Sequence, residues 1–223
     1  FRVLDALAPG RIDLGVGRAP GRDGRTAQLL NPDRRAAERF PIQVQELQAW
    51  VTGMELPPDH PGHGVHAYPH GPTDPELWML GSSDYGAQLA AHLGLPYAFA
   101  WFITDGEGAA EALDLYRRTY RPSPRHPRPQ AALCVWALVA DTEAEARHHA
   151  LSRERWRMDR NLGRLGPLLP PDQAERPWTA AEAASLERMR QRAFVGAADA
   201  VAGRLRDLAV ELQIEDLAVI TWA

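Results

Sequence analysis

Residues 4–21, LDALAPGRIDLGVGRAPG, contain the end of a helix, a stop, a strand and a glycine-rich turn in direct succession. Apolar residues at positions 1, 3, 4 and 7 are predicted to form the inward-facing stripe of a helix end, and Pro9-Gly10 ends that helix. Residues 12–16 then alternate apolar with small or polar side chains, which predicts a strand. A helix followed at once by a strand is typical of α/β proteins.

The rest of the chain continues this alternation. Periodicity and N-cap residues such as Asp33 and Thr179 predict further helices at 33–52, 87–93, 107–120, 142–160, from 179 onward and at 198–212. Apolar runs predict strands at 77–80, 97–103, 131–140 and 217–222. Residues 53–75 and 161–178 are predicted as irregular insertions, because proline and glycine interrupt any period there.

Strands that alternate with helices predict a parallel sheet covered by helices. Five such strands would form most of a (β/α)8 barrel, and they fit an open doubly wound sheet equally well. We expect residues 1–223 to form a single domain, since the length lies within the range of one large domain.

The composition excludes several classes of function. The net charge of −4 gives no electrostatic reason to expect nucleic acid or a membrane as partner. All 25 basic residues are arginine, so no lysine Schiff base or P-loop lysine exists in this chain. The single cysteine, Cys134, excludes an intrachain disulfide. With no signal peptide and no long apolar run, we expect a cytoplasmic protein.

Two glycine-rich strand exits are candidate binding sites. Arg18 stands where the strand 12–16 ends, and its guanidinium suits an anion. Gly81-Ser82-Ser83-Asp84 lies between a strand and a helix, where free backbone N–H groups and serine hydroxyls favour an anion. The local sequence leaves open whether Arg18 is simply a surface residue and whether Ser83 or Asp84 is simply an N-cap.

Other motifs do not support a site. The run His60, His63, His66 and His70 lies in a proline- and glycine-rich segment without cysteine, and we interpret these side chains as solvated rather than as metal ligands. The sequence contains neither G-x-S-x-G nor G-x-G-x-x-G leading into a helix, so serine hydrolysis and a Rossmann dinucleotide site have no support.

Two stretches together resemble one family. Residues 4–21 resemble the LDxLxPGRIDLGxGRAPG segment of bacterial luciferase-like flavin-dependent monooxygenases. Residues 77–83, LWMLGSS, and 90–100, AAHLGLPYAFA, are similar to that family's LWLLGSS and AAxLGLPYAFA segments. Weaker matches occur at Tyr116-Arg117 with Pro122-Ser123 and at residues 140–146, ADTEAEA. The resemblance covers nearly the whole chain.

The resemblance implies a luciferase-like (β/α)8 TIM barrel that binds reduced FMN at the carboxyl ends of its strands. Carried over by position, Arg18 would contact the flavin phosphate, and Ser82 and Ser83 would form the other side of that phosphate site. Tyr85 would border the flavin, and an arginine at 35 or 39 would assist. The implied chemistry is oxygenation of a small-molecule substrate by reduced flavin and molecular oxygen, in a pocket that excludes water.

The resemblance also implies partners and an extent. A separate flavin reductase would supply reduced FMN, and the protein would form a homodimer. Family members have about three further β/α units before the segment at Leu4 and a final helix after Trp222. We therefore expect this chain to correspond to strands four to eight. The catalytic residues stay unidentified, because no residue here matches the histidine that the missing strands usually carry.

Two alternatives to the monooxygenase remain at this point. One is a flavin-binding protein of the same fold that lacks catalysis. The other is an unrelated TIM-barrel enzyme with a phosphate-bearing ligand, in which the phosphate commonly follows strands seven and eight.

Overall fold

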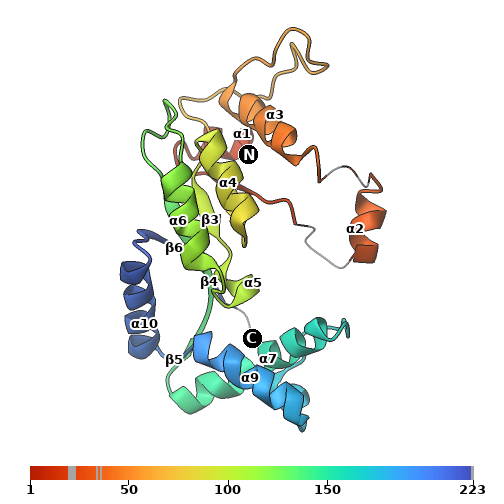
Figure 1. Cartoon of the computed structure of the whole chain (residues 1–223), viewed down its shortest axis with the longest axis vertical. Helices are drawn as coiled ribbons and strands as arrows, with labels where there is room; N and C mark the ends of the chain where they lie inside the picture. The colour runs from red at the N-terminus through yellow and green to blue at the C-terminus, as the bar shows by residue number, and fades with distance from the viewer. Residues whose placement is uncertain (20–23, 34, 36, 222–223) are drawn as a thin grey trace. The chain divides into compact units, whose positions relative to one another are not determined.

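The computed structural model describes residues 1–19, 24–33, 35 and 37–221. They form alternating helices and strands that divide into two compact units, coloured along the chain in Figure 1. Unit 1 consists of residues 1–99 and 110–131, and unit 2 consists of residues 100–109 and 132–223. The strand pairs within each unit are parallel, as the sequence predicts.

Unit 1 is built on three neighbouring strands, β1 (Asp13–Val16), β2 (Glu76–Gly81) and β3 (Tyr97–Phe99). In the register of the sheet, Val16 pairs with Met79, and Met79 pairs with Tyr97. The helices of this unit are α1 (Arg2–Leu7), α2 (Gly24–Leu30), α3 (Phe40–Thr52), α4 (Asp84–Leu93) and α6 (Ala109–Thr119). Helix α4 packs against β2 and β3 (Figure 1).

Two tyrosines form the centre of unit 1. Tyr97 on β3 and Tyr116 on α6 are fully buried, and their ring centroids lie 5.5 Å apart. The Tyr116 hydroxyl donates to the carbonyl of Leu95 at 2.9 Å and accepts from the N–H of Gln130 at 3.1 Å. The phenol therefore satisfies backbone groups in the segments that lead into β3 and β4, and its own polar atom does not stay unpaired in the core.

The expectation that the apolar stripe of the first helix faces inward was wrong, because Phe1, Val3, Leu4 and Leu7 are exposed and the buried residues of α1 are Arg2 and Asp5. Arg2 holds the irregular residues 53–75 in place within unit 1. No helix or strand forms between α3 and β2, so this segment depends on side-chain contacts. The guanidinium of Arg2 pairs with Asp74 and donates to the carbonyls of Val51 at 2.8 Å and Pro69 at 3.0 Å. One side chain thus bridges the end of α3 and the last part of the irregular segment.

Unit 2 is built on β4 (Ala131–Ala140), β5 (Phe194–Ala197) and β6 (Asp216–Ile220). The first half of β4, Ala132–Trp136, pairs with β6, and the second half, Ala137–Ala140, pairs with β5. The helices of this unit are α5 (Trp101–Thr104), α7 (Glu143–Asn161), α8 (Pro171–Ala174), α9 (Ala180–Arg192) and α10 (Ala198–Glu211).

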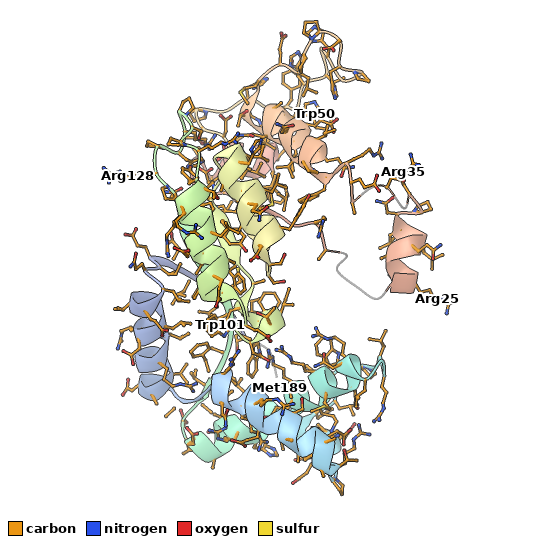
Figure 2. All side chains as sticks on the ribbon, viewed as in Figure 1. Arg25, Arg35, Trp50, Trp101, Arg128 and Met189 are labelled. Carbon is orange, nitrogen blue, oxygen red and sulfur yellow. The ribbon has the colours of Figure 1, made fainter. Side chains whose placement is uncertain are left out.

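Small residues bring α7 close to the strands of unit 2. Ala146 and Ala150 are buried against Trp136, Leu138 and Val195. Further along α7, Met158 packs with Leu186 and with Met189, which Figure 2 labels on α9. Helix α9 begins at the predicted capping box, in which the Thr179 hydroxyl accepts from the N–H of Glu182 and the Glu182 carboxylate accepts from the N–H of Thr179.

Several predicted boundaries were wrong. The helix expected at 33–52 begins at Phe40, where Pro41 fits the first turn, and Asp33 instead accepts from the N–H of Arg35 at 2.9 Å. The strand expected at 97–103 ends at Phe99, and the apolar run that follows forms α5. A short apolar run has no period that separates one helical turn from a strand.

Three short elements were missed. Helix α2 lies in a stretch for which no element was predicted, helix α8 lies in the predicted irregular segment 161–178, and β5 has four residues between two alanine-rich helices. In the strand predicted at 217–222, the structure describes β6 through Ile220, and Trp222 lies outside the described residues.

Candidate functional site

The candidate site lies where β1 and β2 end, at one edge of the sheet of unit 1. The two strands are parallel, so their carboxyl ends meet. Gly17, directly after β1, passes close to β2: a Cβ at this position would lie 3.2 Å from the backbone oxygen of Leu80. The glycine therefore lets the chain leave β1 beside β2 and places Arg18 next to the loop that leads into α4.

A second close contact shapes the loop itself. Gly81 ends β2 and Gly86 lies in the first turn of α4, and a Cβ on either would come within 3.2 Å of the other's Cα. Both also contact the ring of Tyr97, whose hydroxyl reaches the carbonyl of Ser83 at 3.4 Å. The ring of buried Tyr97 therefore packs against both ends of the loop from Gly81 to Gly86.

Burial raises the pKa of the Tyr97 hydroxyl far above its ordinary value, and the negative charge of Asp84 raises it further. The phenol is therefore neutral at physiological pH, and it can donate to the carbonyl of Ser83. Nothing in the local sequence distinguishes Tyr97 from other core aromatics, so its supporting role could not be predicted.

Ser83 occupies the N-cap position of α4 in an extended conformation, but its hydroxyl makes no capping hydrogen bond. The first helical bond here runs from the N–H of Ala87 to the carbonyl of Ser83. The N–H groups of the residues between them precede the helical ladder and point out of the helix start. Ser82 is half-buried and Ser83 is exposed, and among the described residues neither hydroxyl has a hydrogen-bond partner.

Arg18 is stacked on the ring of Tyr85, the second residue of α4, with its Cζ 3.7 Å from the ring centroid. Within the described part of the chain, Arg18 has no carboxylate partner. Stacking occupies the face of the guanidinium and not its in-plane N–H donors. The structure thus brings Arg18 and Tyr85 together, beside the loop that carries Ser82 and Ser83.

Two other charges bear on this site. Asp84, exposed at the start of α4, suits the positive end of the helix but would repel a second anion there. Arg39, expected as a possible assistant, pairs instead with Asp33 at 2.8 Å. Arg35 is exposed. Pro20 and Gly21, which belong to the predicted turn after Arg18, lie outside the described residues.

The loop histidines have separate contacts. His60 bonds Glu46 at 2.9 Å, His63 bonds the carbonyl of Leu56 at 2.8 Å, and His70 bonds Arg2 at 2.9 Å. In the part of the chain that the structure describes, no group of three histidine, cysteine, aspartate or glutamate residues is arranged to hold a metal ion. Nor does any described helix combine the length and apolar character needed to cross a bilayer.

The fold and the site define a parallel β/α protein with a candidate anion-binding edge formed by two adjacent strands. The sequence profile of the family described as "Luciferase-like monooxygenase" matches residues 1–216. The chain belongs to this family, and its fold is that of the luciferase-like TIM barrel, so the predicted family and fold class are confirmed. The open doubly wound sheet and the unrelated phosphate-ligand enzyme are thereby excluded.

Individual relatives agree with this assignment. A protein of Escherichia coli K12 named "Luciferase-like monooxygenase" is 34% identical over 98% of this chain and 64% of its own length. The solved structure of apo-MsnO8 has 33% identity and a TM-score of 0.80, and the match covers all of this chain and 66% of that one. The chain spans 63–67% of the length of the curated relatives that match nearly all of it.

A more distant solved structure shares the fold alone. It is the oxygenating constituent of 3,6-diketocamphane monooxygenase from Pseudomonas putida, a type II Baeyer-Villiger monooxygenase in complex with FMN. Its TM-score is 0.56 at 16% identity, over 94% of this chain and 64% of that one. Members of the family use FMN or the deazaflavin F420.

Proposed function

We propose that the protein is a flavin-dependent monooxygenase that uses reduced FMN and molecular oxygen on a small organic substrate. The observation that carries this proposal is the pairing of Arg18 with Tyr85 at the start of α4. It places a guanidinium without a carboxylate partner in the described residues beside two serines whose hydroxyls are unused. Family membership supports a flavin as the anion-bearing ligand.

The residues present fit a flavin phosphate. Arg18 would donate two parallel hydrogen bonds to phosphate oxygens, and the N–H groups at the start of α4 would donate from a second direction. The hydroxyls of Ser82 and Ser83 would complete the grip, and Tyr85 would border the flavin. The Gly81–Gly86 contact would hold this loop in place, because neither position has room for a side chain.

When bound, reduced flavin supplies two electrons to molecular oxygen, so that one oxygen atom enters the substrate and the other leaves as water. The contribution of this chain is to bind the phosphate, to orient the flavin and to exclude water from its reactive face. We also propose that a separate reductase supplies the reduced flavin, since the sequence has no dinucleotide fingerprint. A homodimer is proposed as the assembly.

Flavin titration tests the phosphate site directly. We expect FMN to bind about tenfold or more tightly than riboflavin, which lacks the phosphate, because charge-assisted hydrogen bonds contribute strongly to affinity. Equal dissociation constants for FMN and riboflavin would contradict the assignment. F420 in a parallel titration distinguishes the deazaflavin, and light scattering of the purified protein tests the dimer.

The remaining alternative is a flavin-binding protein of this fold without catalysis. Oxygen consumption by the reduced FMN complex distinguishes the monooxygenase from the non-catalytic flavin-binding protein. A monooxygenase consumes oxygen in proportion to oxygenated product when the substrate is present. Stable FMN binding with no substrate-dependent oxygen consumption, across a broad substrate panel, would favour the non-catalytic protein.

A further inference from the structure

Helix α7 in unit 2 has a buried face that changes from alanine to arginine. Ala146, Ala150, Arg153 and Arg157 follow one another at intervals of four, three and four residues, which places them on one side of the helix. All four are buried. The alanines pack against the strands, so the two arginines continue the same inward face where apolar side chains would be expected.

A cavity of about 90 Å³ lies beside these arginines. Trp136 and Trp156 form part of its wall, and Arg153, Arg157 and Arg160 line it from α7. Ile220, the last residue of β6 and the strand partner of Trp136, closes another side. The cavity therefore lies at the carboxyl end of β6, which is the end of the strands where β/α barrels bind their substrates.

The charges around this cavity are predominantly positive. Arg157 pairs with Asp105 at 2.8 Å and donates to the carbonyls of Phe102 and Ile103 at 2.9 Å each. Its Nε remains buried and has no hydrogen-bond partner among the described residues. The carboxylate of Glu154, next along the helix, is occupied by Arg190 through two hydrogen bonds of 2.8 and 2.7 Å.

The titration of Arg153 agrees with an excess of positive charge. Burial lowers the pKa of Arg153 to about 10, and the positive charge of Arg157 lowers it further by more than Asp105 raises it. Asp105 offsets one of the positive charges that Arg153, Arg157 and Arg160 bring to the cavity wall. An anion that entered the cavity from solution would add a further negative charge beside guanidinium groups that are costly to bury.

The tryptophans indicate an organic anion. Arg153 lies 4.0 Å over the ring of Trp136, and Arg160 lies 5.3 Å from the ring of Trp156. A carbon skeleton gains from contact with these rings and with Ile220, whereas an inorganic ion does not. The cavity is smaller than the roughly 150 Å³ that holds benzene, so it fits a head group whose body extends outward.

We propose that this cavity binds the carboxylate of a small organic acid, and that such an acid is the substrate. The second half of this statement rests on the proposed monooxygenase function, whereas the binding site itself does not. In this proposal, the arginines of α7 determine which substrate binds.

Calorimetric titration of the purified protein without flavin tests the site. Benzoate, phenylacetate and octanoate serve as probes, with benzamide as the neutral counterpart of benzoate. We expect benzoate to bind at least about tenfold more tightly than benzamide. Arg160→Gln and Arg153→Gln should each weaken benzoate binding about tenfold. Arg188→Gln, which removes an exposed arginine from α9, should leave it unchanged.

Arg160 is exposed, so its variant reports on the site even where Arg153→Gln does not fold. Equal affinity for benzoate and benzamide, no binding of any carboxylate probe, or full affinity in Arg160→Gln would overturn the proposal. Inorganic phosphate that binds as tightly as benzoate, with the same dependence on Arg160, would overturn the organic acid.

Failure of this proposal is distinguishable from failure of the proposed function. Flavin binding that does not depend on the phosphate contradicts the monooxygenase and leaves the carboxylate titrations standing. Conversely, carboxylates that bind at Arg160 but stimulate no oxygen consumption by the reduced FMN complex contradict the substrate assignment alone.

Discussion

At the scale of single residues, the stacking of Arg18 on Tyr85 orders a long side chain before a ligand arrives. An arginine loses up to about 2 kcal/mol of rotamer entropy when it is fixed. Because the ring already orders this side chain, less of that entropy is lost when a ligand binds. The planar guanidinium suits both the ring face and a phosphate, and a lysine at this position would lose the parallel pair of donors.

We predict that Arg18→Ala weakens FMN binding by about 1–3 kcal/mol, the range for losing a charge-assisted hydrogen bond. Fluorescence titration of FMN measures the effect. Arg11→Ala, which removes an exposed arginine before β1, is the matched control and should leave the dissociation constant unchanged. An unaltered affinity in Arg18→Ala would refute the assignment of this residue.

The glycine contact beneath the loop gives a second prediction at this scale. Gly86→Ala would place a methyl group 3.2 Å from the Cα of Gly81, closer than most real Cβ contacts. We expect a loss of about 1–3 kcal/mol in unfolding free energy from overpacking, measured by urea denaturation. Gly203→Ala, with open space around its Cβ, serves as control and should not destabilise the protein.

Strand exits and helix starts are local features, so the sequence marked Arg18 and the segment 81–84 as candidates, whereas the phosphate roles and Tyr85 came from the family resemblance. The sequence could not reveal the support from Tyr97, since that contact depends on the register of β2 with β3. The arginines of α7 carried a readable signal, namely their spacing at one helical face. Without the strands opposite, that face could equally have been solvated.

At the scale of elements, α7 and α9 are joined by a partly buried ion pair with two hydrogen bonds. Arg190 donates two hydrogen bonds to Glu154, whose side chain is only 10% exposed. One turn further along α7, Met158 packs with Leu186 and Met189 of α9. Removing the arginine would leave a largely buried carboxylate without compensation.

We predict that Arg190→Ala lowers the free energy of unfolding by about 2 kcal/mol, less than for a fully buried pair because Arg190 is partly exposed. Chemical denaturation measures the loss. The exposed pair of Arg118 with Asp114 provides the comparison, and Arg118→Ala should change stability by less than about 1 kcal/mol. Equal losses in the two variants would contradict a larger contribution of the partly buried pair to stability.

The elements that the sequence predicted best have strong hydrophobic periodicity or clear capping and termination signals. The starts of α7 and α9 agree with prediction because the side chains of Thr142 and Thr179 cap them. β5 was missed and the end of β3 was misplaced because four-residue apolar runs take their conformation from tertiary neighbours. In β5 those neighbours are β4, α7 and α10.

At the scale of the whole molecule, buried tyrosines link stability to alkaline pH. Burial raises the pKa of Tyr97 and of Tyr116 above the ordinary value of 10.0. In the unfolded chain both phenols ionise near pH 10, whereas in the folded protein they stay neutral. The unfolded state therefore releases protons first, and stability falls as pH rises above about 10.

We predict that the free energy of unfolding is independent of these groups below pH 10 and then falls by up to about 1.4 kcal/mol per pH unit for each tyrosine. Urea denaturation at pH 8 and pH 11 measures the slope. Tyr97→Phe should reduce it, whereas Tyr68→Phe, at an exposed position, should not. The same stability at both pH values in the unmodified protein would disprove this linkage.

The divided pairing of β4 has a consequence for how the chain reaches its fold during synthesis. Ala132 pairs with Asp216, so one edge of β4 waits until almost all of unit 2 has left the ribosome. Contacts this distant in sequence form slowly, because the loop between them must close first. Until β6 emerges, the first half of β4 lacks its partner on that edge, and an apolar strand with an unpaired edge is prone to pair with other nascent chains.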